Sequence, residues 1–394
     1  MNNEIIGVIG SGAMGSGIAQ AAATAGHKVI VFDNNIQALE NSKSNLSSYL
    51  AKLVEKQKLS LDESNNIFSN IKIESNILKL NHCNLIIEAI SENLESKQKL
   101  FFDLERVVGD SCLLASNTSS LSITSIASAC INQARVIGLH FFNPVSLMPL
   151  VEIIPGIATG VKRIDEVKAM IINWKKVPVI AKDTPGFIVN RIARPFYGEA
   201  IRIYEEGIAD FSTIDWAVKE MGGFKMGPFE LMDMIGNDIN YTVTEAIWEQ
   251  FFFDPRYKPS LTQKRLFEAK HFGRKSGRGY YDYLPAGPAG SSSLMIPAPN
   301  KDESRGKKIF YRILIMLINE ASDALYYGVA TKEDIDLAMT KGVNYPKGLF
   351  KWADEIGVPS VLSKLEKLYT KYAEDRYRPS VLLKKMTKEG KTFY

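Results

Sequence analysis

Two ionisable residues, His140 and Glu152, lie in apolar runs where charged side chains are uncommon. His140 ends the run "RVIGLH", and Glu152 lies inside "LVEII". An ionised carboxylate in such a run costs free energy unless it is paired. If the two runs form neighbouring strands, Glu152 can accept a hydrogen bond from one imidazole nitrogen and leave the other basic and directed at a substrate. Such a base removes the hydroxyl proton when an alcohol is oxidised by hydride transfer; a histidine with a purely structural role is the alternative.

The other histidines and the cysteines indicate no comparable chemistry. His27 lies in the turn "AGHKV", where we expect it at the surface, and His82 and His271 have polar sequence neighbours. Three cysteines, Cys83, Cys112 and Cys130, show neither CxxC nor metal-ligand spacing. We expect free thiols in a reducing compartment and no metal site.

The stretch "GVIGSGAMGSGIAQ" (7–20) contains Gly10, Gly12 and Gly15 in the spacing GxGxxG. An apolar strand precedes it and a helix of small residues, opened by Ala13 and Met14, follows. Gly10 allows a tight turn, Gly12 allows the backbone to approach a pyrophosphate, and Gly15 allows close packing of helix on strand. A tight turn without a ligand is the alternative. The next apolar run, "KVIVFD", ends at Asp33, which can bind both ribose hydroxyls and would repel a 2′-phosphate, so the sequence favours NAD over NADP.

The elements that position these residues alternate along residues 1–183, where we place an NAD-binding domain. Helical stretches at 14–25, 36–57 and 94–107 lie between short apolar runs. This alternation predicts an α/β, Rossmann-type domain with a parallel, doubly wound sheet. The runs expected to form strands are "IIGVIG", "KVIVFD", "LIIEAI", "LLASN", "RVIGLHFF", "LVEIIP" and "VPVIAK".

The remaining chain predicts an all-α region. Residues 184–284 form a helical domain whose first helix we expect to open at Thr184 and Pro185, with a kink at Pro195 and a stop at Gly207. A Pro-, Gly- and Ser-rich linker (285–306) leads to a second helical domain, 307–394. We expect the basic tail of that domain to be the solvated end of a helix.

The two helical domains are copies of one another. Residues 191–236 align without gaps to 312–357, with 14 identities in 46 positions at an offset of 121. The second copy has Tyr311 where the first has Asn190, and it has no dinucleotide domain of its own. We therefore expect it to be degenerate and to dock on the first copy within one chain.

Composition excludes several classes of protein. The net charge of +4 over 394 residues does not indicate a nucleic-acid partner, and no apolar run reaches membrane-spanning length. No cleavable leader is apparent, so we expect a cytoplasmic protein without a membrane partner.

The chain resembles the NAD-dependent L-3-hydroxyacyl-CoA dehydrogenase family. Six stretches carry the resemblance and fall in the family's order: "GVIGSGAMGSGIAQ", "IEAISENLESKQKLF", "SNTSSLSIT", "GLHFFNPVSLMPLVEII", "KDTPGFIVNRI" and "GPFELMDMIG". The resemblance implies oxidation of an L-3-hydroxyacyl-CoA to the 3-oxoacyl-CoA, in fatty-acid β-oxidation or aromatic-acid catabolism. It leaves the acyl chain length open. A dehydrogenase of a small hydroxy acid without CoA and a non-catalytic NAD-binding scaffold are the alternatives.

The resemblance also implies roles for individual residues. His140 would be the base and Glu152 its partner, while Ser119 and Asn190 would bind the reacting oxygen of the substrate. Asn143 would lie in the substrate site, and Lys56 would contact CoA, although it could equally belong to a solvated helix face. The cofactor would be bound by Gly10, Gly12, Ala13, Met14, Gly15, Asp33, Glu92, Lys97 and Asn117. Shorter family members pair two chains through their helical domain, so this chain is expected to be either a homodimer or a monomer with an intrachain pseudo-dimer.

Overall fold

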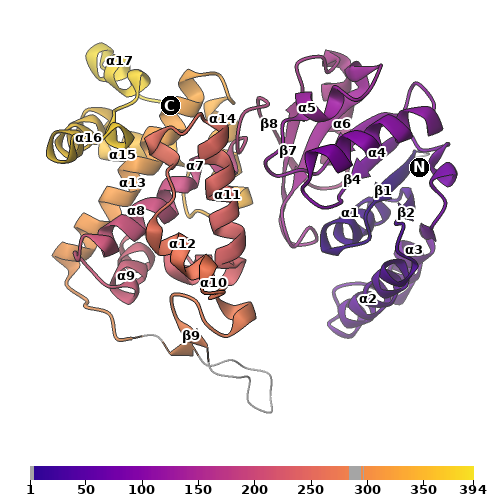
Figure 1. The fold of residues 1–394 in the computed structure, drawn as a ribbon, viewed down its shortest axis with the longest axis horizontal. Coiled ribbons are helices and arrows are strands. Elements are labelled where there is room, and N and C mark those ends of the chain that lie inside the picture. Colours follow the sequence, from indigo (N-terminus) through magenta and orange to yellow (C-terminus); the bar gives the residue numbers. More distant parts are fainter. Residues whose placement is uncertain (1–3, 284–293, 296) are drawn as a thin grey trace. The chain divides into compact units, whose positions relative to one another are not determined.

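The computed structural model describes residues 4–283, 294–295 and 297–394. The chain divides into two compact units, which we call unit 1 (Met1–Phe187) and unit 2 (Ile188–Tyr394) (Figure 1). Of the predicted linker (285–306), residues 285–293 and 296 lie outside the described residues, and residues 303–306 already belong to a helix. In the part of the chain that the structure describes, no helix is long and apolar enough to cross a membrane.

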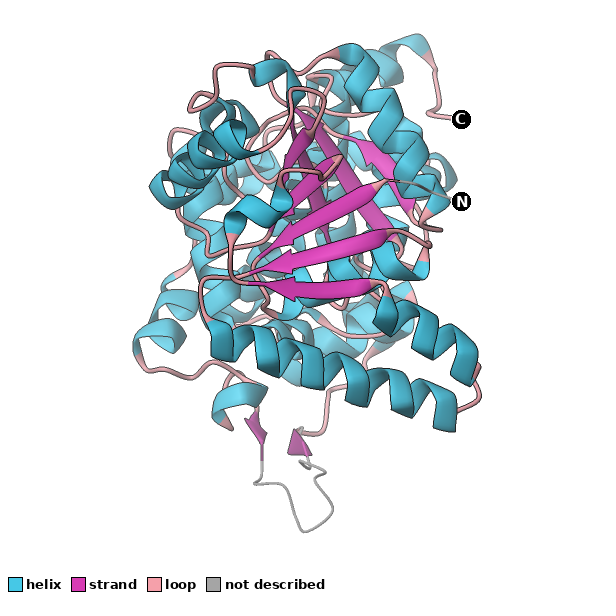
Figure 2. Ribbon diagram, turned by 90° about the vertical axis from the view of Figure 1, so that its right-hand side faces the viewer, coloured by secondary structure: helices cyan, strands magenta, loops and turns pink. Residues whose placement is uncertain are grey.

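Unit 1 is built on an eight-stranded sheet with the order β3-β2-β1-β4-β5-β6-β7-β8 (Figure 2). Neighbouring strands are parallel except β6 and β7, which are antiparallel. The strands are β1 (Ile5–Ile9), β2 (Lys28–Phe32), β3 (Ile71–Glu74), β4 (Leu85–Glu88), β5 (Leu113–Ser116), β6 (Val136–Phe141), β7 (Leu150–Pro155) and β8 (Val177–Ile180). All seven predicted strands are present. The edge strand β3 was not predicted, because its alternating "IKIE" lacks the continuous apolar run that marks a strand buried on both faces.

Helices connect the strands of unit 1, as expected of a doubly wound sheet. They are α1 (Ala13–Thr24), α2 (Ile36–Glu55), α3 (Leu61–Ser69), α4 (Leu94–Val107), α5 (Ile123–Ala127) and α6 (Val161–Asn173), with short 3-10 helices at Ile77–Leu80 and Gln133–Arg135. The three predicted helices therefore agree with the structure to within two residues at each end. Apolar side chains of α1, α2 and α6 pack on the sheet and form its core.

In unit 1 the surface position predicted for His27 is wrong, whereas the prediction of free cysteines is confirmed. His27 is buried rather than exposed: its Nδ1 lies 3.2 Å from the carbonyl oxygen of Glu4, and its ring lies 5.7 Å from Trp174. The turn at Gly26 leads straight into β2 and directs the ring inward, which the polar sequence context did not reveal. The three cysteines are free and buried. Burial raises the pKa of Cys83 and of Cys112 to about 12, so both thiols stay protonated.

In its described residues, unit 2 has helices and one short strand pair, β9 (Asp282–Tyr283) and β10 (Leu294–Met295). Its first six helices are α7 (Val189–Ile192), α8 (Arg194–Glu205), α9 (Phe211–Gly222), α10 (Pro228–Ile235), α11 (Asn237–Gln250) and α12 (Leu261–Glu268). The next five are α13 (Glu303–Tyr326), α14 (Lys332–Gly342), α15 (Leu349–Ile356), α16 (Val358–Tyr372) and α17 (Val381–Glu389). Short 3-10 helices are η3 (Pro255–Tyr257), η4 (Arg274–Ser276) and η5 (Asp375–Tyr377).

The first helix of unit 2 begins later than predicted. Residues 185–188 form turns, with Gly186 and Phe187 at positive φ, so the helix opens at Val189 and not at Pro185. The expected kink at Pro195 is a break at Ala193, because Pro195 has no N–H to continue α7 and instead occupies the first turn of α8.

The helices of the two copies correspond element by element. Offsets of 120 or 121 residues relate α9 to α14, α10 to α15, α11 to α16, η3 to η5 and α12 to α17. The contacts between the copies are reciprocal. Arg191 Nε donates to Glu320 Oε1 at 2.7 Å, and its counterpart Arg312 Nε donates to Glu199 Oε1 at 2.5 Å. Such an exchange of equivalent residues is the signature of a two-fold interface, here formed within one chain.

Buried tyrosines and a second arginine complete this interface. Tyr257 donates to Glu320 at 2.6 Å, and Tyr377 donates to Glu199 at 2.8 Å. Arg256 also pairs with Glu320. Burial opposes ionisation of Glu320, yet its two arginine partners hold the pKa of this carboxyl below its usual value. Glu320 is therefore a buried anion that depends on its partners.

The tail of unit 2 is not the solvated helix end that we expected. After Gly390 the chain turns back, and the backbone N–H groups of Phe393 and Tyr394 donate to Asp354 at 2.8 and 2.9 Å. The first copy has the same arrangement, in which Tyr280 and Tyr281 donate to Asp233. The expectation is wrong because the partner of the tail, Asp354, lies 40 residues away in the sequence.

Removing the carboxylate of Glu320 should destabilise unit 2. In Glu320→Ala, Arg191 loses its buried partner while Arg256 keeps Asp323, and breaking a buried pair costs about 3–5 kcal/mol of unfolding free energy. Urea denaturation followed by tryptophan fluorescence measures the change. The exposed Glu366 on the neighbouring α16 supplies the control variant Glu366→Ala, which should change stability by less than about 0.5 kcal/mol. Equal effects of the two substitutions would contradict the assigned role.

Candidate active site in unit 1

His140 and Glu152 lie directly opposite each other on β6 and β7. His140 Nδ1 is 2.6 Å from Glu152 Oε2, the Glu152 side chain is fully buried, and His140 is 6% exposed. The other residues of both strands are apolar and mostly buried, so the pairing of the strands brings the His140 and Glu152 side chains into contact inside the sheet. Phe142 and Phe187 lie against the imidazole, with ring centroids 4.4 and 6.0 Å away.

With Glu152 ionised, this geometry puts the proton of the neutral imidazole on Nδ1. An ionised carboxylate only accepts hydrogen bonds, so Nδ1 of His140 donates to Glu152. Nε2 of the same ring then carries a lone pair and can accept a proton. If it does, the imidazolium that forms is stabilised by the buried Glu152 carboxylate. The pair has the arrangement of a general base and the residue that orients it.

The segment that carries Asn117 and Ser119 is joined to the strand of His140. It follows β5, which pairs in parallel with β6. Asn117 Oδ1 accepts a hydrogen bond from the backbone N–H of Phe141 at 2.8 Å. The structure thus places the half-buried Asn117 beside the histidine strand, at the carboxyl end of β5, where open α/β sheets bind their ligands.

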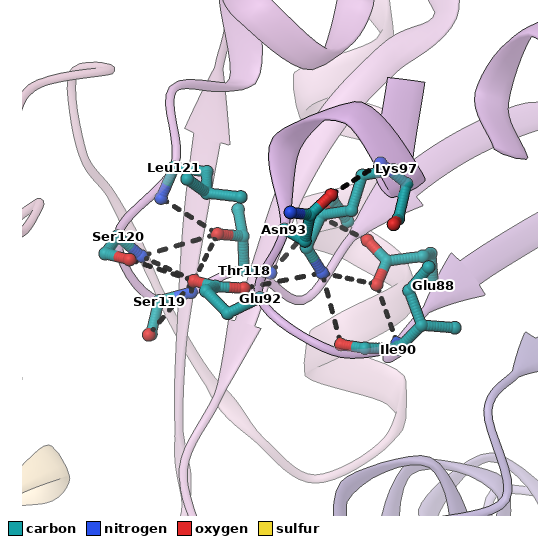
Figure 3. A network of polar contacts seen from close by, with 11 residues as sticks. Glu88, Ile90, Glu92, Asn93, Lys97, Thr118, Ser119, Ser120 and Leu121 are labelled. Carbon is teal, nitrogen blue, oxygen red and sulfur yellow. Dashed lines mark hydrogen bonds and ion pairs between the residues drawn. The ribbon is translucent and has the colours of Figure 1, made fainter. Parts of the chain in front are cut away.

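Glu92 organises the turn that contains Ser119. Its Oε1 accepts hydrogen bonds from the Thr118 hydroxyl at 2.7 Å and from the backbone N–H groups of Ser119 and Ser120 at 2.9 and 3.1 Å (Figure 3). Burial opposes ionisation of Glu92, but Lys97 and these donors hold the pKa of the carboxyl below its usual value. The carboxylate therefore acts as a fixed anchor for the turn.

Lys97 lies behind Glu92 and is almost completely buried. Its Nζ is 2.5 Å from Glu88 Oε1 and 3.4 Å from Glu92 Oε2, and Figure 3 shows the lysine between the two carboxylates. Glu88 also accepts a hydrogen bond from the Ser116 hydroxyl at 2.6 Å. Sequence reasoning missed Glu88, although it ends the apolar run "LIIE" in the same way that His140 ends its own. The predicted contact of Lys97 with a cofactor stays a prediction; in this structure the ammonium holds the two acidic side chains.

The glycine motif has the backbone expected of a nucleotide cradle. Gly10 has φ +98°, and its N–H donates to the carbonyl of Phe32 at 2.9 Å. A Cβ on Gly15 would lie 1.8 Å from the carbonyl oxygen of Gly10, so only glycine permits this approach of α1 to β1. Gly12 precedes Ala13 at the start of α1 without a side-chain cap, and a Cβ there would meet open space. The first N–H groups of α1 can therefore receive a pyrophosphate.

Asp33 is fixed beside this cradle, immediately after β2. One of its carboxylate oxygens accepts hydrogen bonds from the backbone N–H and the hydroxyl of Ser11, both at 2.8 Å, and the other accepts from the N–H of Asn35 at 3.0 Å. Partial burial opposes ionisation, but these donors hold the pKa of Asp33 below its usual value. The charge and position fit a ribose rather than a 2′-phosphate.

The other three predicted site residues are Asn143, Lys56 and Asn190. Asn143 is exposed just after β6, and Lys56 is exposed at the C-terminal end of α2. Asn190 belongs to α7 in unit 2, where its carbonyl accepts a hydrogen bond from Arg194 at 2.8 Å. The roles of these residues stay predictions.

Two family models match the chain. The model described as "3-hydroxyacyl-CoA dehydrogenase, NAD binding domain" matches residues 5–184. The model described as "3-hydroxyacyl-CoA dehydrogenase, C-terminal domain" matches residues 186–283 and again residues 309–393. The chain thus carries the NAD-binding domain of this family and two matches to its helical domain.

Individual relatives extend the similarity over nearly the full length. The 3-hydroxyadipyl-CoA dehydrogenase of Escherichia coli K12 is 36% identical over 98% of this chain and 97% of that protein. The mitochondrial hydroxyacyl-coenzyme A dehydrogenase of Homo sapiens is 41% identical over 70% of this chain and 90% of its own. A crystal structure of 3-hydroxybutyryl-CoA dehydrogenase from Escherichia coli K12 superposes with a TM-score of 0.90 at 35% identity, covering 99% of this chain and 100% of that one. On these grounds, the chain belongs to the 3-hydroxyacyl-CoA dehydrogenase family.

Proposed function

We propose that the protein catalyses the reversible, NAD-dependent oxidation of an L-3-hydroxyacyl-CoA to the 3-oxoacyl-CoA, in fatty-acid β-oxidation or aromatic-acid catabolism. The observation that carries this proposal is the buried 2.6 Å contact between His140 Nδ1 and Glu152, in a chain with the family's NAD-binding domain. Oxidation of the hydroxyl group requires removal of one proton and one hydride. The histidine pair supplies the acceptor for the proton.

In this reaction the residues of the chain transfer the proton and orient the substrate. His140 Nε2 takes the hydroxyl proton, and Glu152 stabilises the imidazolium through Nδ1. Bound NAD supplies the nicotinamide that accepts the hydride. In the reverse direction the protonated His140 returns its proton to the substrate oxygen. Ser119 and Asn190 orient that oxygen with neutral hydrogen-bonding groups.

The remaining predicted residues bind the two ligands. The glycines 10, 12 and 15, with Ala13 and Met14, receive the pyrophosphate, and Asp33 receives the adenosine ribose. Glu92 and Lys97 hold the turn of Asn117 and Ser119 along the cofactor. Asn143 belongs to the substrate site, and Lys56 contacts the CoA moiety.

We also propose that the second helical copy takes the place of a partner subunit. The reciprocal pairs of Arg191 with Glu320 and of Arg312 with Glu199 support this proposal, since equivalent residues exchange partners across one interface. A chain that satisfies this interface internally does not need a second chain to cover the same face.

Substitution of the catalytic pair should separate chemistry from cofactor binding. Removing the base in His140→Ala, or the charge of its partner in Glu152→Gln, should lower kcat by about 10²–10⁴-fold. The dissociation constant for NADH, measured by fluorescence titration, should change by less than about threefold, because neither residue belongs to the glycine cradle. Unchanged turnover in either variant would remove the pair from the mechanism.

Neutralising Asp33 should relax the choice of cofactor. In Asp33→Asn the repulsion of a 2′-phosphate is lost while the side chain can still accept from Ser11, so the preference for NADH over NADPH in kcat/KM should fall at least about tenfold. Steady-state kinetics with both cofactors measures the ratio. An unaltered ratio would show that Asp33 does not discriminate.

The substrate class is tested with acetoacetyl-CoA. This thioester should oxidise NADH as its 3-oxo group is reduced to a hydroxyl group. Free acetoacetate should not, because the free acid lacks the CoA moiety that the site is proposed to bind. Loss of NADH absorbance follows the reaction. Equal rates with the free acid would favour a dehydrogenase of small hydroxy acids, and no reaction with either would favour a non-catalytic scaffold. A series of acyl lengths, including one ending in a carboxylate, then ranks the substrates.

A further inference from the structure

A groove on unit 2 combines lysines with an apolar floor. It lies between the first turns of α13 and the second half of α16 and has a volume of about 330 Å³. We call it the basic groove; it is lined on α13 by Lys307, Lys308, Tyr311, Arg312 and Ile315, and on α16 by Lys364, Lys367, Leu368 and Lys371. Its volume is within the range of small-ligand sites.

Most of the positive charge in the basic groove is not neutralised by the protein. Two cations of the lining are paired, Lys307 with Glu303 at 3.3 Å and Arg312 with Glu199 and Glu206. Among the described residues, no carboxylate forms an ion pair with Lys308, Lys364 or Lys367. The three lysines therefore concentrate positive charge without internal compensation.

The floor of the basic groove is apolar and aromatic. Ile315 is buried, Leu368 is half-buried, and Tyr311 is 39% exposed. The Lys364 ammonium lies 5.7 Å from the centre of the Tyr311 ring. The lysine lies over one face of the ring, and the exposed part of Tyr311 can contact a flat heterocycle while the lysines receive its phosphates.

Comparison of the two helical copies shows that this character belongs to the second copy alone. At the offset of 121 residues, α16 corresponds to α11, and both helices begin immediately after a glycine. Lys364, Lys367 and Lys371 stand where the first copy has Val243, Ala246 and Gln250, respectively.

The first turns of α13 show the same divergence. Tyr311 corresponds to Asn190, the residue proposed above to bind substrate in the first copy. The face of the helical domain that carries a predicted substrate residue in one copy has thus become basic and aromatic in the other. Packing support alone requires neither change, because these side chains are exposed.

From this arrangement we propose that the basic groove is a second, non-catalytic binding site for the phosphorylated adenosine end of CoA. Lysine ammonium groups bind phosphates as point charges, and CoA carries a 3′-phosphate in addition to its diphosphate. The uncompensated lysines match this higher charge, and Tyr311 provides a face for the adenine. The choice of CoA over other phosphorylated adenosines rests on the proposed function, since a CoA thioester is the substrate there.

Calorimetric titration of the full chain with CoA, without NAD, tests the proposal. The wild type should bind one more equivalent of CoA than the groove variant Lys364→Glu/Lys367→Glu, in which affinity at the groove should fall at least about tenfold through two charge reversals. The extra equivalent should weaken steeply with added salt. The steady-state kcat and KM for acetoacetyl-CoA should be the same in both proteins.

The control variant is Lys384→Glu/Lys385→Glu, which makes the same change of charge on exposed lysines of α17 in the same unit. It should retain the extra equivalent. The proposal is overturned if the wild type and the groove variant bind equal amounts of CoA, or if the control loses as much binding as the groove variant.

Two further probes separate the chemical sources of the binding. Adenosine 3′,5′-bisphosphate should compete for the groove, whereas NADH or inorganic phosphate at the same concentration should not; effective competition by either would overturn the assignment to CoA. A wrong proposed function would give a different result: neither protein would reduce acetoacetyl-CoA, while the difference in bound CoA between the wild type and the groove variant would persist.

Discussion

The contact between His140 and Glu152 is the interaction on which the rest of unit 1 depends. A carboxylate fully buried in a sheet is costly unless a hydrogen-bond donor compensates it, and the imidazole is that donor. In the antiparallel pairing of β7 with β6 the two residues face each other in register, which allows this compensation. A shift of this register by one residue would turn the Glu152 side chain to the other face of the sheet.

The same requirement of paired burial shapes the surroundings of the site. Glu88, Lys97 and Glu92 form a short chain of charges from the interior of the sheet to the turn of Ser119. Because each charge is bonded to its neighbour, the turn cannot move independently of β4 and α4. A serine that must orient a substrate hydroxyl benefits from this rigidity, since small displacements at a reacting centre lower the rate strongly.

In unit 2, buried charges are likewise paired, here between the two helical copies. Glu199 and Glu320 are each buried and each paired with an arginine of the other copy. Buried pairs of this kind specify one way of docking, because any other arrangement would leave charges uncompensated. Once the copies are held in this manner, the exposed faces of the second copy are free to diverge. The lysines of the basic groove occupy such a face.

The fold was predictable because its signals are local. The glycine spacing and the acid at the end of β2 lie within the first 33 residues, and continuous apolar strands recur through unit 1. The duplication could be detected because residues 191–236 align to 312–357 without gaps at one offset of 121 residues. The surface prediction for His27, the helix start at Pro185 and the solvated tail were wrong, because the first depends on how a turn directs a ring inward and the last on a partner 40 residues distant.

The sequence by itself determined the class of fold, the glycine cradle with Asp33, and His140 and Glu152 as the candidate pair. Only the tertiary structure decided that this pair meets across an antiparallel register, that Glu88 joins Lys97 beneath Glu92, and that arginines are exchanged between the two copies. The physical reason is the range of the interactions. Hydrophobic periodicity and turn chemistry act between near neighbours, whereas a buried charge needs a partner that chain folding brings from far along the sequence.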